Sequence, residues 1–180
     1  MDREKVLQKI EAAWQELTES YAGIPEAQMT EPGVRRVITR SGVVFSPRGG
    51  VLAYLALPFR FFVGGRLGHG RQWISWIHLA DEIGAIRFLI ENDKARGPFN
   101  LTSPHPITNA EMSRDIGKVL HRPAFVPVPG FAMRLALGEL AQLLLLGGQR
   151  VVPQRLQQMG YAFQFAEPEP ALRNLLAGHA

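Results

Sequence analysis

The chain has 180 residues, 46% of them hydrophobic, which is enough for one to one and a half folded domains and argues against disorder. It has no cysteine, so disulfides and thiolate metal sites are excluded, and a reducing compartment fits. The net charge is +4, but its 20 Lys and Arg residues are scattered and form no run of five like charges, which does not favour nucleic-acid binding.

Residues 2–22 are predicted to form an amphipathic helix, because apolar residues recur at steps of three and four. These residues are Val6, Leu7, Ile10, Trp14, Leu17 and Tyr21. Asp2 can cap the helix, and Gly23 and Pro25 end it. The stretch EKVLQKIEAAWQELTESYAGIPEAQMTEPGV resembles the first helix of DinB-like four-helix-bundle proteins, although the other three helices of such a bundle do not follow. We therefore expect residues 1–34 to be an added N-terminal helix and turn.

The composition changes near residue 36, where an α/β pattern begins. Residues 37–45, VITRSGVVF, have the β-branched density of a buried parallel strand. Residues 51–63 form an apolar helix-like segment that contains Pro58 and Arg60 and is too short to span a bilayer. The charged start of the chain also lacks the apolar stretch of a signal peptide. We expect a soluble, cytoplasmic protein.

A glycine-rich loop, a strand and a helix follow in GGRLGHGRQWISWIHLADEIG, residues 64–84. The loop is basic, so either an anionic ligand or an ordinary solvated turn would suit it; it matches neither G-x-G-x-x-G nor G-x-x-x-x-G-K-[ST]. Residues 72–78 suit a buried strand that ends at His78, for which a structural role is favoured over that of a base. Asp81 and Glu82 open a helix. Its buried stripe is predicted to be Ile83, Ile86, Leu89 and Ile90.

The rest of the chain alternates short strands and helices. A capping box at Thr108–Glu111 predicts a helix to about His121, on which Glu111 and Asp115 are interpreted as a solvated charged face. The other expected elements are strands at 99–102 and 125–129, helices at 131–146, 154–159 and 170–176, and an extended piece around 163–165.

The order of glycine-rich loop, Gln, aromatic residue, Ile-His and acidic helix start resembles the extended short-chain dehydrogenase/reductase superfamily. The string GGRLGHGRQWISWIH is similar to its epimerase-like subfamily of NAD(P)-dependent sugar-nucleotide epimerases, and the flanks at 40–50 and 97–102 agree. Residues 128–131 and 148–153 resemble the domain of unknown function that closes that subfamily. Two positions depart from the pattern: Ala80 replaces the usual first Asp of the helix start, and Ile74 replaces an Arg found in many sugar-nucleotide epimerases.

The resemblance, which covers residues 37–176, implies an α/β fold: a partial doubly wound, Rossmann-like parallel sheet with a C-terminal helical cap. The expected domains are the N-terminal helix at 1–34, the C-terminal part of a dehydrogenase-like domain at 35–126, and the small helical domain of unknown function at 127–180.

Complete members of the superfamily carry G-x-x-G-x-x-G, which holds the cofactor pyrophosphate, and Tyr-x-x-x-Lys, which supplies the acid/base. The first motif does not precede residue 37, and residues 25, 58 and 165, four after the three tyrosines, are Pro, Pro and Phe. We therefore predict no catalytic and no cofactor-binding residues here, with NAD(P) expected only in complete relatives. Histidine spacing predicts no metal site, and no G-x-S-x-G elbow occurs.

Three hypotheses remain open. The chain is the substrate-side C-terminal portion of an epimerase-like protein that is inactive alone, with no nucleic-acid or membrane partner. Alternatively, it is an interaction module that docks on itself or on a separate nucleotide-binding chain through exposed strand edges. The third is a fusion or truncation product without selected activity. If a substrate site survives, Gln72, Trp73, Ser75 and His78 are predicted to line it.

Overall fold

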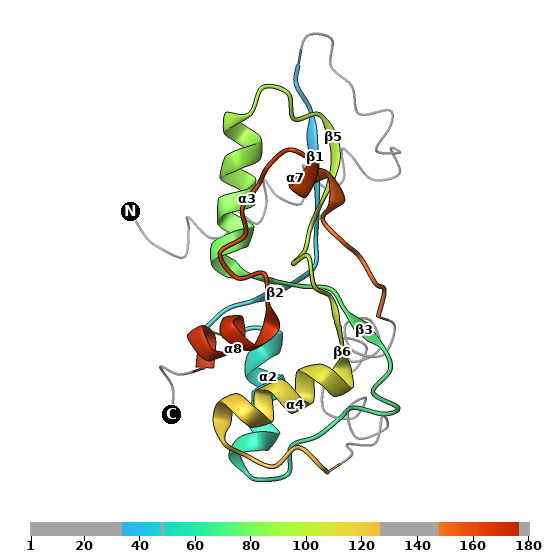
Figure 1. Ribbon diagram of the computed structural model, residues 1–180, viewed down its shortest axis with the longest axis vertical. Coiled ribbons are helices and arrows are strands. Elements are labelled where there is room, and N and C mark those ends of the chain that lie inside the picture. The colour runs from blue at the N-terminus through green and yellow to red at the C-terminus, as the bar shows by residue number, and fades with distance from the viewer. Residues whose placement is uncertain (1–33, 48, 127–147, 177–180) are drawn as a thin grey trace, which may run out of the picture. The chain divides into compact units, whose positions relative to one another are not determined.

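A computed structural model of the chain describes residues 34–47, 49–126 and 148–176 (Figure 1). The chain separates into two units, residues 1–36 and 37–180, and the elements below belong to the second. The helices expected at 2–22 and 131–146 lie outside the described residues. Most of the strand expected at 125–129 also lies outside the described residues. The domain boundary expected between residues 126 and 127 falls where the described part of the chain stops.

Two parallel strand pairs form the centre of this unit. The strand expected at 37–45 is divided into β1 (Val37–Ser41) and β2 (Val43–Phe45). β1 pairs with β5 (Gly97–Leu101), whereas β2 pairs with β4 (Trp76–His78), so both pairs are parallel as predicted. The division falls at Gly42, where a Cβ atom would collide with the carbonyl oxygen of Ser75. A short antiparallel pair joins β3 (Trp73–Ile74) to β6 (Ile107–Thr108).

Helix α3 (Leu79–Glu91) packs against the parallel pairs and corrects one sequence prediction. Of the four residues predicted as its buried stripe only Leu89 is buried, whereas Ile83, Ile86 and Ile90 are 59%, 39% and 66% exposed. The residues that face the core are Asp81, Glu82, Ala85 and Leu89. The prediction was wrong because hydrogen bonds to the two acidic side chains turn their side of the helix inward, which the pattern of apolar residues does not record.

The larger core cluster lies between β2, β4 and three helices: α2 (Val51–Arg60), α4 (Asn109–Leu120) and α8 (Pro168–Leu176). α4 begins with the predicted capping box: the Thr108 Oγ1 accepts from the Glu111 N–H at 3.3 Å, and a Glu111 carboxylate oxygen accepts from the Thr108 N–H at 2.7 Å. The helix ends at His121, whose φ of 53° is left-handed, so both predicted ends are confirmed.

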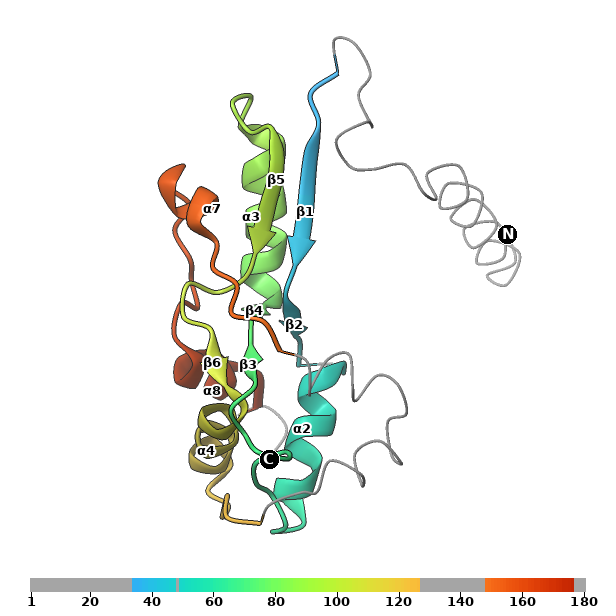
Figure 2. The same cartoon turned by 90° about the vertical axis from the view of Figure 1, so that its right-hand side faces the viewer.

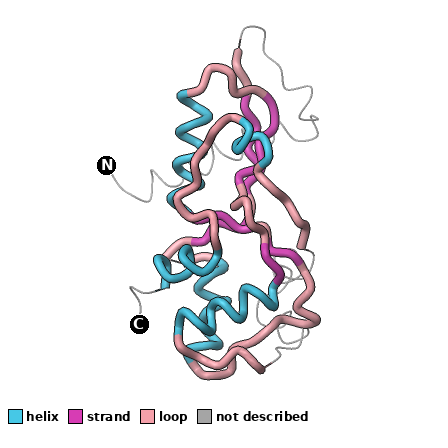
Figure 3. The backbone as a smooth tube through the Cα atoms, viewed as in Figure 1, coloured by secondary structure: helices cyan, strands magenta, loops and turns pink. Residues whose placement is uncertain are grey.

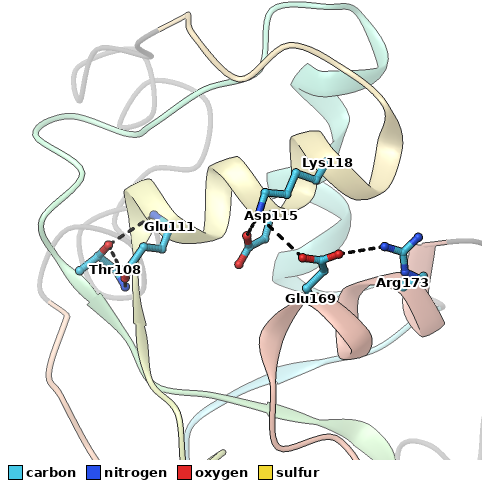
Figure 4. A network of polar contacts seen from close by, with 6 residues as sticks. All are labelled: Thr108, Glu111, Asp115, Lys118, Glu169 and Arg173. Atoms are coloured by element: carbon cyan, nitrogen blue, oxygen red, sulfur yellow. Dashed lines mark hydrogen bonds and ion pairs between the residues drawn. The ribbon is translucent and has the colours of Figure 1, made fainter.

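Ion pairs on the surface join α4 to α8 (Figure 4). The Lys118 ammonium lies 3.5 Å from the Asp115 carboxylate and 3.8 Å from that of Glu169, which also pairs with Arg173 at 2.9 Å. Burial raises the pKa of Asp115 above its usual value despite the nearby Lys118. The predicted charged face of α4 is therefore partly covered by α8.

A smaller cluster lies between α3, β5 and α7 (Gln154–Gln158), and Leu156 is its fully buried contribution from α7. Figure 2 shows β1 and β5 side by side with α3 behind them. Loops join these elements, and residues 61–72 between α2 and β3 form one of the longest (Figure 3).

Candidate functional site

A cavity of about 460 Å³ with a basic lining lies where residues 150–155 pass the β1–β5 pair. Its charged lining residues are Arg40, Arg150 and Arg155, with Asn100 and Gln154 between them, and none of its described lining residues is acidic. We call this the basic cavity. Guanidinium groups bind carboxylates and phosphates in a bidentate way, so the basic cavity suits an anionic ligand.

Arg155 forms a fixed wall of the basic cavity. Its guanidinium donates to the carbonyl oxygens of Pro98 at 2.6 Å and Arg96 at 2.8 Å, and it lies 4.2 Å from the centroid of the buried Phe99 ring. These contacts use much of its hydrogen-bonding capacity, so Arg155 contributes mainly positive charge and shape.

The segment 148–151 brings Arg150 to the basic cavity, and Ser75 holds this segment in place. The Ser75 hydroxyl donates to the carbonyl oxygen of Gln149 at 2.6 Å and accepts from the Val151 N–H at 2.8 Å. A Cβ atom at Gly148 would collide with the Trp73 carbonyl oxygen. The Arg150 guanidinium then lies 5.3 Å from the centroid of the Trp73 ring, a cation–π contact.

His78 has a structural role at the start of α3. Its Nδ1 accepts from the Ala80 N–H at 3.0 Å and so caps the helix, which explains how α3 begins without the customary Asp at position 80. Its Nε2 lies 3.2 Å from Asn174 Oδ1, and its ring stacks on Phe165 at 3.9 Å. Burial lowers the pKa of His78 below its usual value.

Gln72 lies in a buried amide cluster near the glycine-rich loop. Its Nε2 donates to the Leu67 carbonyl oxygen at 3.0 Å, and Asn109 Oδ1 accepts from the Leu67 N–H at 2.7 Å. Gln72 Oε1 and Asn109 Nδ2 are buried without a hydrogen-bond partner.

The glycines of that loop are packed against the chain itself. A Cβ at Gly64 would collide with the Phe59 ring, and a Cβ at Gly65 with the Val126 carbonyl oxygen. Gly68 and Gly70 adopt φ values of 54° and 72°, which glycine tolerates readily. Of the two interpretations of the loop, this packing supports the one without a ligand.

Asp81, at the start of α3, anchors the C-terminal segment. Asp81 is fully buried, and its carboxylate accepts from the N–H groups of Gln164 at 2.7 Å and Phe165 at 2.9 Å. The Tyr161 hydroxyl donates to the Asp81 carbonyl oxygen at 3.0 Å, and burial, with the nearby Asp81 charge, raises the pKa of Tyr161 to about 12. Tyr161 is therefore a protonated structural donor.

Glu82 lies on the other side of this helix start, next to β1. Its Oε1 accepts from the Ser41 hydroxyl at 2.6 Å, and its Oε2 is buried without a partner. Burial raises the pKa of Glu82 above its usual value, against the opposing effect of the Ser41 hydrogen bond.

The four predicted site residues fall into separate places. Trp73 and Ser75 contact the segment that carries Arg150, next to the basic cavity, whereas Gln72 and His78 lie in separate hydrogen-bond clusters. That all four line one substrate site stays a prediction. Sequence reasoning missed Arg40, Arg150 and Arg155 as a group, because positions so far apart carry no shared spacing signal.

The start of α3 provides a test of whether an NAD(P) pyrophosphate fits this parallel βα junction. A pyrophosphate binds a helix N-terminus through exposed N–H groups and a favourable dipole. Here the first turn carries Asp81 and Glu82, and His78 occupies the Ala80 N–H. Because of these two acidic side chains and the occupied N–H group, this junction does not fit a pyrophosphate.

Comparison with known proteins agrees with this arrangement of elements. A domain of unknown function (DUF1731) matches residues 128–175. The epimerase family protein SAR0825 of Staphylococcus aureus is 41% identical over 150 residues, which cover 83% of this chain and 50% of that protein, and YfhF of Bacillus subtilis is 41% identical over 145 residues. Over about four-fifths of its length this chain is thus similar to epimerase family proteins. It spans about half the length of these relatives.

Solved structures of epimerases share this fold. The human epimerase family protein SDR39U1, determined with NADPH, superposes with a TM-score of 0.77 at 35% identity, covering 84% of this chain and 51% of that one. A UDP-glucose 4-epimerase from Thermus thermophilus, 16% identical with a TM-score of 0.61, shares the fold. The predicted Rossmann-like α/β class and the resemblance to the C-terminal portion of epimerase-like proteins are therefore confirmed.

Two further searches concern only the described part of the chain. Within residues 34–47, 49–126 and 148–176, no three His, Asp or Glu side chains gather as metal ligands. None of the described helices combines the length and apolar character required to cross a bilayer.

Proposed function

We propose that this chain is the substrate-side C-terminal portion of an NAD(P)-dependent epimerase-like protein and is inactive alone. One observation carries the proposal. This chain superposes on about half of SDR39U1, a protein determined with NADPH, but its sequence contains neither G-x-x-G-x-x-G nor Tyr-x-x-x-Lys.

The basic cavity is the proposed contribution to substrate binding. Arg150 on Trp73, with Arg40 and Arg155 beside it, offers positive charge for an anionic group such as the diphosphate of a sugar nucleotide. Trp73 and Ser75 act mainly by positioning the segment 148–151. Gln72 and His78 lie in hydrogen-bond clusters apart from the basic cavity and have structural roles there.

Calorimetric titration of the purified chain with NADPH tests the proposal. We expect no saturable heat up to about 1 mM, a range in which even weak binding would register. Titration with UDP-glucose should give weak heat that the variant Arg150→Gln reduces, while Arg114→Gln, an exposed arginine on α4, leaves it unchanged. Stoichiometric NADPH binding by the chain alone would refute the proposal.

A second candidate function, the interaction module, is favoured by one specific observation. Three isoleucines on one flank of α3 are exposed, where a surface helix usually carries polar residues. Exposed apolar stripes of this kind mark sites of protein association.

A further inference from the structure

A group of exposed apolar side chains lies where α2 ends, at the lower end of the ribbon in both views (Figures 1 and 2). Its members, which are between 50% and 78% exposed, are Phe61, Phe62, Val63 and Phe125. Two segments far apart in the sequence bring them together, because the Val126 N–H donates to the Gly64 carbonyl oxygen at 3.2 Å. We call these four residues the apolar tip.

Phe62 keeps an aromatic side chain at a position that usually holds glycine. Its φ is 60°, and the N–H groups of Phe62 and Val63 donate to the carbonyl oxygens of Phe59 and Pro58, each at 3.0 Å. In this Schellman pattern the left-handed residue is normally glycine, because a Cβ atom is strained there. The Arg122 guanidinium lies 4.4 Å from the centroid of the Phe62 ring. An exposed ring on a strained backbone indicates a role that local packing does not explain.

The segments that form the apolar tip carry charge of one sign. Three exposed arginines, Arg60, Arg66 and Arg122, belong to them. No acidic residue occurs in the sequence of residues 34–80 or 116–126. The exposed isoleucines of α3 differ in this respect, because that helix carries three acidic residues. Apolar side chains among arginines suit an anionic bilayer surface, where the rings enter the acyl boundary and the guanidinium groups bind phosphates.

Two other occupants of the apolar tip fit less well. A second copy of the chain, placed tip to tip, would bring the arginines of both copies together, which is repulsive. A stable protein interface takes about 20–30 residues from each side. The apolar tip has only a few residues, at the end of a helix and in a neighbouring segment. A bilayer needs no larger complementary surface.

We propose that the apolar tip binds the surface of membranes that contain anionic phospholipids. Phe61 and Phe62 enter the interfacial region, and the arginines contact the lipid phosphates. Such binding is peripheral, since none of the described helices can cross a bilayer. The expectation of a chain without a membrane partner concerned segments that span a bilayer, and a surface site lies outside it.

Sedimentation of the full chain with vesicles tests the proposal. We expect binding to vesicles of phosphatidylcholine with about one third phosphatidylglycerol, weakening as salt is added, and none to phosphatidylcholine alone. Phe61→Ser/Phe62→Ser should lower the partition coefficient at least about tenfold, because two buried rings are lost. Arg122→Gln should lower it about fivefold, as expected for one arginine near an anionic surface.

Two further variants serve as controls. Ile83→Ser/Ile86→Ser removes apolar side chains that are also exposed, on α3, and should leave vesicle binding unchanged. Phe62→Gly removes one ring and suits the left-handed backbone, so it should unfold at no lower denaturant concentration than the wild type and still bind vesicles more weakly.

Four outcomes would overturn the inference. The first is equal binding, or no binding, to both kinds of vesicle, and the second is binding that the phenylalanine pair does not weaken or the isoleucine pair weakens equally. The third is a homodimer that dissociates when the phenylalanine pair is changed, which would assign the apolar tip to a second copy. The fourth is unfolding of Phe61→Ser/Phe62→Ser at a lower denaturant concentration than the wild type and the isoleucine pair, which would mean that the chain's own residues cover the tip.

Discussion

The two flanks of α3 differ in how they meet the rest of the molecule. On one flank, Asp81 accepts hydrogen bonds from the backbone of residues 164 and 165, and Tyr161 packs on Phe88. On the other flank, three isoleucines are exposed beside β1. The polar flank is thus the one that packs against the described chain, whereas the apolar flank is exposed.

This difference teaches that hydrophobicity and burial need not coincide in a chain that spans half of its relatives. A carboxylate that accepts from two backbone N–H groups can be fully buried, whereas isoleucine side chains of the same helix stay exposed. Four predictions break or sharpen the comparison.

Asp81→Ala should have the largest effect, because it leaves the N–H groups of Gln164 and Phe165 without their acceptor in a buried region. At about 1–3 kcal/mol for each unsatisfied group, we expect a loss of about 4 kcal/mol in the free energy of unfolding, measured by urea denaturation. Asp93→Ala, on an exposed residue after α3, should change it by less than about 0.5 kcal/mol. Equal effects of the two variants would contradict the anchoring role.

Leu89→Ala and Ile83→Ala compare a buried and an exposed position on the same helix. Leu89 is 2% exposed, so its truncation should cost about 3 kcal/mol through lost burial and a cavity. Ile83 is 59% exposed, and its truncation should stay within about 0.5 kcal/mol. Thermal and urea unfolding of both variants check this, and a loss at Ile83 comparable with that at Leu89 would restore the stripe predicted from the sequence.

His78→Asn keeps a helix-capping side chain but removes the titrating ring and its stacking on Phe165. We expect a loss of about 1 kcal/mol at pH 8. Because burial lowers the folded pKa of His78 below its usual value, the unfolded chain binds the extra proton first as the pH falls. This residue's contribution is complete above pH 6.5 and is lost as the pH falls through the folded pKa.

Unfolding measured across that pH range should therefore show a rise in stability with pH that is weaker in His78→Asn. His121→Asn, at an exposed left-handed position that Asn tolerates, is the control and should keep the rise. If the stability of His78→Asn depends on pH in the same way as that of the wild type, the rise in stability with pH comes from other titratable groups.

The smallest effects are expected on α4. Lys118→Ala removes ion pairs of 3.5 and 3.8 Å from a side chain that is 63% exposed, and should cost less than about 0.5 kcal/mol. Glu111→Ala on the same helix breaks the capping box and should cost about 1 kcal/mol. If Lys118→Ala lowers the free energy of unfolding more than Glu111→Ala does, the α4–α8 ion pairs of Figure 4 contribute more stability than expected for exposed ion pairs.

The sequence predicted local features best. The start and end of α4 were predicted correctly because the Thr108–Glu111 pair and the left-handed position at His121 act within one turn. The parallel strands were predicted from β-branched density, but their division at Gly42 depends on the carbonyl group of Ser75, which approaches from a distant strand.

The face of α3 and the basic cavity could not be predicted in the same way. Asp81 turns inward because donors about 80 residues later in the chain reach it. Arg40 and Arg150 meet around one cavity only after β1 and the segment 148–151 are in place. Such groupings depend on tertiary contacts, which neither periodicity nor motif spacing encodes.

The two hydrogen bonds of the Ser75 hydroxyl to residues 149 and 151 engage main-chain groups of those residues. Gly148 adds a close approach of backbone to backbone. Position 150 can therefore exchange its side chain without shifting the peptide that carries it, so the charge of the neighbouring cavity is open to change by single substitutions while the scaffold remains the same.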